Sequence, residues 1–119
     1  PQAMQPWEYN IARAIQNPPL EKFQKNTAGI LKRIQESGYL QKELDAGVPL
    51  EQAKRTLPFV HNEQKGLLAI DQRPPKGGVQ LRLYIYPQEQ TRMIHLTSIG
   101  DKQSQQKDIK IGHQFIQTL

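Results

Sequence analysis

Apolar and polar residues alternate with a period of two near the start of the chain. Trp7, Tyr9 and Ile11 are separated by polar residues, and this spacing is typical of a half-buried strand. A helix could also hold residues 7–15. The segment is therefore predicted to form a strand, with a helix as the alternative.

The pattern changes to spacings of three and four residues, which predict helices. Asn17 can cap the first helix because a proline follows it, and Ser37-Gly38 is expected to end it. A second helical segment begins near Tyr39 and stops at Gly47-Val48-Pro49, and a short helix is predicted over residues 50–57. The apolar stripe of the first helix consists of Leu20, Phe23, Thr27, Ile30, Leu31 and Ile34.

Strands are predicted from residue 65 onward. Residues 65–73, 79–86 and 92–99 are strand candidates, with a turn at 74–78 and another at 87–91, so that the last two form an antiparallel hairpin. Strand side chains alternate between faces. One face should carry Leu81, Leu83, Ile85, Ile94 and Leu96; the other should carry Arg82, Tyr84 and Tyr86 of one strand and Met93, His95 and Thr97 of the next.

The chain is expected to end in a helix that Ser104 caps and whose Ile109 and Ile116 share one face. The order is then strand, two or three helices, three strands and a helix, which is an α+β arrangement. A chain of 119 residues is long enough for one domain, predicted over residues 4–119. Residues 1–3 precede a methionine and are expected to be left over from expression.

The amino-acid composition argues against metal chemistry and indicates the kind of partner. The chain has no cysteine and only three histidines, and Asp71 is the only acidic residue in the strands predicted from residue 65 onward, so neither a metal nor another cofactor is expected. The net charge of +5 favours a polyanionic or acidic partner. No apolar run approaches the roughly 20 residues of a membrane helix and no leader is recognisable, so the protein is expected in the cytoplasm.

The element order and two sequence runs resemble the RelE/ParE toxin superfamily, particularly the HigB-like branch of type II toxin–antitoxin systems. The runs are Val79-Gln80-Leu81-Arg82-Leu83-Tyr84-Ile85-Tyr86 and, after Met93-Ile94-His95-Leu96, the segment 100–109. Similarity at the level of residues is confined to about 79–110. The resemblance implies a small antiparallel sheet with the N-terminal helices packed on one face and a C-terminal helix.

The resemblance also implies an activity. Members of the RelE and HigB branches cut mRNA, usually within the ribosome and without a metal, whereas ParE members poison DNA gyrase; one fold serves both. We therefore expect an mRNA endoribonuclease that acts at the ribosome and is paired with an acidic or partly disordered antitoxin. The alternatives are a non-nuclease toxin that binds gyrase and a small non-enzymatic nucleic-acid-binding module.

Cleavage of RNA without a metal needs groups that move protons and neutralise the phosphate. By resemblance, Arg82 would contact phosphate, and Lys102 would neutralise it from a loop in which Asp101 stands where the family usually has a lysine. Each of these residues also has an ordinary structural explanation, as a surface charge or a packing side chain. The predicted catalytic residues are Arg82, Tyr84, His95 and Lys102, and the predicted RNA-binding residues are Arg73, Tyr86 and Lys107. His113 is expected to line the rim of the core or to close the site, and His61 is given no role.

Overall fold

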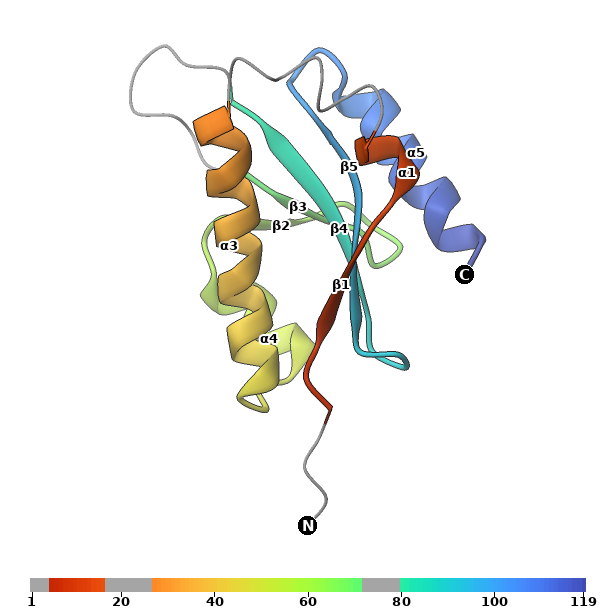
Figure 1. Cartoon of the computed structure of the whole chain (residues 1–119). Coiled ribbons are helices and arrows are strands. Elements are labelled where there is room, and N and C mark those ends of the chain that lie inside the picture. The colour runs from red at the N-terminus through yellow and green to blue at the C-terminus, as the bar shows by residue number, and fades with distance from the viewer. Residues whose placement is uncertain (1–4, 17–26, 72–79) are drawn as a thin grey trace.

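The computed structural model describes residues 5–16, 27–71 and 80–119. In these ranges the order of elements is β1 (Glu8–Ile11), α1 (Arg13–Gln16), α3 (Thr27–Asp45), α4 (Leu50–Thr56), β2 (Val60–Asn62), β3 (Leu68–Ile70), β4 (Arg82–Gln88), β5 (Met93–Gly100) and α5 (Gln105–Gln117) (Figure 1). The α+β class is confirmed.

One five-stranded sheet forms the centre, in the order β1-β5-β4-β3-β2. The β4–β5 hairpin is antiparallel, as predicted, and β3 and β2 continue the antiparallel pairing. The expectation of a wholly antiparallel sheet is wrong, because β1 pairs parallel to β5. The helical region between β1 and the remaining strands provides the long crossover that a parallel pair needs.

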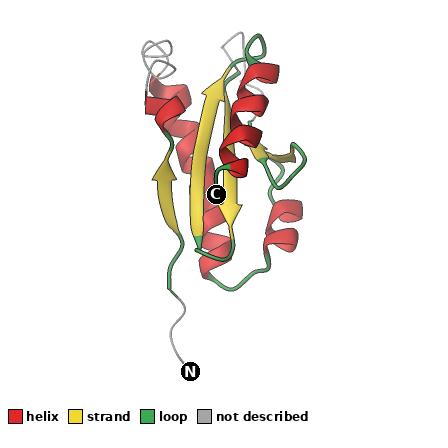
Figure 2. Cartoon of the chain, turned by 90° about the vertical axis from the view of Figure 1, so that its right-hand side faces the viewer, coloured by secondary structure: helices red, strands yellow, loops and turns green. Residues whose placement is uncertain are grey.

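Helices cover both faces of the sheet. The helices α3 and α4 pack on one face and α5 on the other, and Figure 2 shows α5 in front of the strands with α3 behind them. The larger apolar cluster includes Leu40 of α3 together with Leu83, Ile85 and Ile94 of the sheet. A smaller cluster, around Tyr84, packs against α5. The predicted placement of the N-terminal helices on one face is confirmed.

Several predicted boundaries are wrong for identifiable reasons. The helix α3 continues through Ser37-Gly38: Ser37 and Leu40 are fully buried there, and Ser37 Oγ donates a hydrogen bond of 2.5 Å to the carbonyl of Ile34, which satisfies the buried hydroxyl. It stops before Gly47, which has φ +92°. The strand β4 runs through Pro87, where a turn was predicted; β3 pairs only with residues 83–85, so the missing N–H of the proline interrupts no pairing with β3.

Some predictions lie outside the described residues. The start of the first predicted helix and the turn at 74–78 fall there, as does Arg73. The short strand β2 was not predicted.

Candidate functional site

The predicted alternation of side chains along β4 and β5 is confirmed, but α5 covers the face on which the candidate residues lie. Tyr84 packs against Ile109 and Ile116 of α5 and is 0% exposed. His95 is 6% exposed and lies 5.1 Å, between ring centroids, from Phe115 of α5. Tyr84 and His95 therefore lie beneath α5 and are not accessible from solvent.

Two of the predicted residues meet in an open pocket at one end of this face. Gln80, Arg82, Asp101, Lys102 and Gln103 line a volume of about 270 Å³. Arg82 pairs with Gly100 across the β4–β5 ladder, so the loop that begins at Asp101 starts beside it. We call these five residues the Arg82 pocket.

Hydrogen bonds fix the loop that carries Lys102. The backbone N–H of Ser104 donates to Asp101 Oδ1 over 3.1 Å, and Ser104 Oγ donates to Asp108 Oδ2 over 2.7 Å. Ser104 stands at the predicted N-cap of α5, but its hydroxyl does not bond to the backbone of the helix's first turn. It ties the helix to the loop through the side chain of Asp108 instead.

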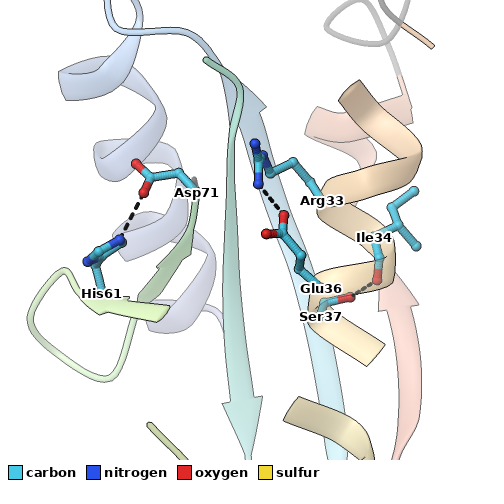
Figure 3. Close-up of polar contacts among 6 residues, drawn as sticks. All are labelled: Arg33, Ile34, Glu36, Ser37, His61 and Asp71. Atoms are coloured by element: carbon cyan, nitrogen blue, oxygen red, sulfur yellow. Dashed lines mark hydrogen bonds and ion pairs between the residues drawn. The ribbon is translucent and has the colours of Figure 1, made fainter. Parts of the chain in front are cut away.

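Asp71 holds the guanidinium of Arg82 from the side. Asp71 Oδ2 lies 3.0 Å from Arg82 Nε. Asp71 Oδ1 lies 2.9 Å from His61 Nε2, and Figure 3 shows this second contact. The strand register explains this arrangement: Ile70 pairs with Leu83 on one side and with Val60 on the other, so the next residue, Asp71, reaches side chains on both neighbouring strands.

Arg82 keeps binding capacity after this contact. The side chains of Arg82 and Asp71 are each 14% exposed. Arg82 Nη1 is buried and has no hydrogen-bond partner among the described residues. A guanidinium held through Nε can still bind an oxygen of a carboxylate or phosphate through its exposed part, whereas the buried Nη1 becomes a second donor only if a neighbouring side chain moves. The geometry therefore describes a small site for an anionic oxygen group.

His95 and Tyr86 lie at the other end of the same face, with their rings stacked 6.2 Å apart. His95 pairs with Tyr86 across the ladder, as Gly100 pairs with Arg82, so four residues of β4, or about 13 Å, separate His95 from Arg82. Both ring nitrogens of His95 are bonded: Nδ1 to Asn10 Nδ2 and Nε2 to Gln88 Oε1, each over 2.9 Å. Burial lowers the pKa of His95, which favours the neutral ring.

The remaining predicted residues lie outside the Arg82 pocket and the Tyr86–His95 pair. Tyr84 lies between the two ends; burial raises the pKa of its phenol well above the usual 10.0, and its hydroxyl has no hydrogen-bond partner within the described ranges. Lys107 is exposed near the start of α5. His113 is half-buried at the rim and bonds through Nε2 to the carbonyl oxygen of Glu63 over 2.9 Å.

The contact of Asp71 with both His61 and Arg82 is not predicted from the sequence. Asp71 was noted only as an acidic residue in a strand, and His61 was left aside because β2 has three residues and shows no alternation long enough to recognise. An antiparallel pairing of residues 60–62 with residues 68–70 places His61 near Asp71, and recognising this pairing would have predicted their contact.

Comparison of the chain with protein-family models, with curated proteins and with solved structures finds no match. Across the described part of the chain, no three side chains of the metal-binding types gather into a possible metal site, and no helix is both long and apolar enough to cross a membrane.

Proposed function

We propose that the protein is the toxin of a type II toxin–antitoxin pair and cleaves mRNA at the ribosome without a metal. The observation that carries the proposal is the Arg82 pocket, in which the two residues that the family resemblance associates with phosphate, Arg82 and Lys102, line one cavity. Arg82 and Lys102 are 20 positions apart in the sequence. They lie in one pocket because Arg82 pairs with Gly100 across the β4–β5 hairpin and Lys102 follows Gly100 in the loop before α5.

The pocket suits the charge that develops during RNA cleavage. In this reaction the 2′-hydroxyl loses its proton and attacks the phosphorus, the bond to the 5′-oxygen breaks to leave a 2′,3′-cyclic phosphate, and the leaving oxygen takes up a proton. Negative charge accumulates on the nonbridging oxygens during this step, and positioned cationic donors stabilise it. Arg82, held through Nε by Asp71, would contact a nonbridging oxygen through the exposed part of its guanidinium, and the exposed Lys102 would add a point charge.

The other candidate residues would have different access to RNA. Tyr86 lines a second pocket with Lys54 and Gln88, from which its ring could stack on a base. Lys107 would contact the backbone outside the Arg82 pocket. Proton transfer by His95 or Tyr84 would require α5 to move, because α5 covers both side chains.

An antitoxin is the partner that this proposal requires. An acidic or partly disordered chain would complement the net charge of +5 and would block the pocket by binding over it.

Induced expression in a bacterial host tests the proposal. Wild type is compared with Lys102→Ala, chosen because this side chain is exposed and lines the Arg82 pocket, and with Lys110→Ala, which removes another exposed lysine, on α5. We expect growth arrest and new 5′ ends in messages, mapped by primer extension, for wild type and Lys110→Ala, and much weaker cleavage for Lys102→Ala.

Other results would contradict the proposal. Arrest with intact messages would indicate gyrase or another protein as the target. Absence of arrest, at a soluble protein level equal to that of the arresting variants, would indicate a non-enzymatic binding module. Arg82→Ala is the second variant, and its circular dichroism must first match wild type because it removes the ion pair with Asp71.

A further inference from the structure

The carboxylate of Asp71 is shared between two cationic or potentially cationic side chains. One oxygen faces His61 Nε2 at 2.9 Å and the other faces Arg82 Nε at 3.0 Å. The His61 side chain is 49% exposed, so protons exchange with solvent there, whereas Arg82 is largely enclosed. Asp71 thus connects an exposed histidine with the arginine of the pocket through the two oxygens of one carboxylate.

We infer that protonation of His61 regulates how strongly the Arg82 pocket holds a phosphate group. The inference deepens the proposed function and rests on it for the identity of the ligand as RNA. When His61 is neutral, the negative charges of Asp71 and Asp101 equal the positive charges of Arg82 and Lys102, so these five side chains carry no net charge. When His61 is protonated, the five side chains carry one positive charge, and an anion is bound more tightly.

Histidine is the side chain whose charge ordinarily changes between about pH 5 and pH 8. Asp71 is the acidic side chain that lies within ion-pair distance of His61 among the described residues. The charged or titratable side chains on the elements around β2 and β3 include Arg33 and Glu36 of α3, Glu51, Lys54 and Arg55 of α4, Glu63 and Lys65 between β2 and β3, Asp71 after β3, Arg82, Tyr84 and Tyr86 of β4, and Lys107, Asp108, Lys110 and His113 of α5. Lys54 and Glu51 pair with each other at 3.0 Å, and Asp108 accepts a bond from Ser104.

Binding and protonation must favour each other equally. If the protonated form of His61 binds a phosphate more tightly by some factor, a bound phosphate raises the proton affinity of His61 by the same factor. The expected factor is about threefold to tenfold, the effect of one unit charge several ångströms from the ligand near a protein surface.

The test measures RNA binding to the purified full chain. The probe is a short fluorescent 2′-O-methyl oligoribonucleotide, which lacks the attacking hydroxyl and so is not cleaved, and whose phosphodiesters do not titrate in the range studied. Affinity is measured by anisotropy at low salt, to limit screening, at about pH 6 and about pH 8. Wild type should bind about threefold to tenfold more tightly at the lower pH.

His61→Gln is the informative variant. Its amide can still donate to Asp71 but stays neutral, so it should match wild type at about pH 8 and lose most of the increase at about pH 6. His113→Gln, which replaces another histidine at the rim of the same face, is the matched control and should keep the increase. In wild type, the NMR midpoint of His61 proton uptake should move to higher pH when the oligonucleotide is added.

Three results would overturn the inference: an unchanged pH effect in His61→Gln, an immobile His61 midpoint, or no binding at either pH. The midpoint measurement uses wild type, so it holds even where His61→Gln does not fold. The proposed function fails separately. If RNA binding depends on His61 but no message is cleaved in cells, the pocket is a regulated RNA site without nuclease activity; if messages are cleaved without dependence on His61, only the inference is lost.

Discussion

The carboxylate of Asp108 lies so close to the backbone of Gly100 that a side-chain carbon on the glycine would collide with it. The hydroxyl of Ser104 would also collide with a side-chain carbon on Gly100. Gly100 ends β5 and pairs with Arg82, so this contact sets the distance between α5 and the strand at the Arg82 pocket.

Gly100→Ala should therefore destabilise the protein. The added methyl group forces Asp108 and Ser104 apart or shifts the start of α5, and overpacking of this kind costs about 1–3 kcal/mol. Urea unfolding followed by circular dichroism measures the loss of unfolding free energy. An unchanged value would mean that the loop of residues 101–104 adapts freely.

Gly38→Ala is the matched control. Gly38 lies inside α3, and a side-chain carbon there would meet no atom within 4 Å. Since alanine restricts the unfolded chain more than glycine and favours helix, the free energy of unfolding should rise by about 0.5–1 kcal/mol. A fall at this position would contradict the continuous helix through Ser37-Gly38.

The elements were predictable where hydrophobic periodicity extends over several residues, as in the β4–β5 hairpin and α5. The elements were not predictable where a few residues determine whether an element forms or ends. Ser37-Gly38 has the composition of a helix end, yet Ser37 is buried and bonded within the helix. The strand β2 is too short to show a period, and the parallel pairing of β1 with β5 depends on contacts between residues about 85 apart in the sequence.

The site was predictable only in part. The alternation along β4 correctly placed Arg82, Tyr84 and Tyr86 on one face, but nothing in that pattern indicated that α5 would cover the middle of the face. The Asp71 contact with His61 and Arg82 arises from the register of three strands, two of which have three residues each. Local sequence carries little information about such a register.

A buried ion pair lies under α3 on the opposite face of the sheet. Arg33 and Glu36 point toward one another from one side of the helix (Figure 3), and both side chains are buried. Arg33→Met should cost about 3–5 kcal/mol, because it leaves the carboxylate of Glu36 without this cation. The double variant Arg33→Met/Glu36→Leu should be more stable than Arg33→Met alone, as measured by urea unfolding; a less stable double variant would contradict this explanation.

The phenol of Tyr84 provides a test of packing against chemistry. Its hydroxyl is buried without a hydrogen-bond partner in the described part of the chain, so Tyr84→Phe should leave the unfolding free energy unchanged or raise it by up to about 1–3 kcal/mol. Tyr84→Ala, which opens a cavity under α5, should lower it by about 3–5 kcal/mol.

Expression of Tyr84→Phe in cells distinguishes a packing role for Tyr84 from a catalytic one. If the residue only packs, Tyr84→Phe should cleave messages as wild type does in the expression assay. Loss of cleavage in this stably folded variant would instead show that the hydroxyl takes part in the reaction and that α5 moves to expose it.

His95 should make the fold less stable in acid. Burial lowers its pKa below the ordinary 6.5, so as the pH falls through about 6.5 the unfolded chain takes up a proton that the folded chain resists, and stability declines until the folded pKa is reached. Above about 6.5 both states hold a neutral ring and the effect vanishes. His95→Gln removes this contribution. The difference in unfolding free energy between pH values of about 7.5 and about 5 should be smaller in the variant than in wild type, and an equal difference would place the acid sensitivity in other groups.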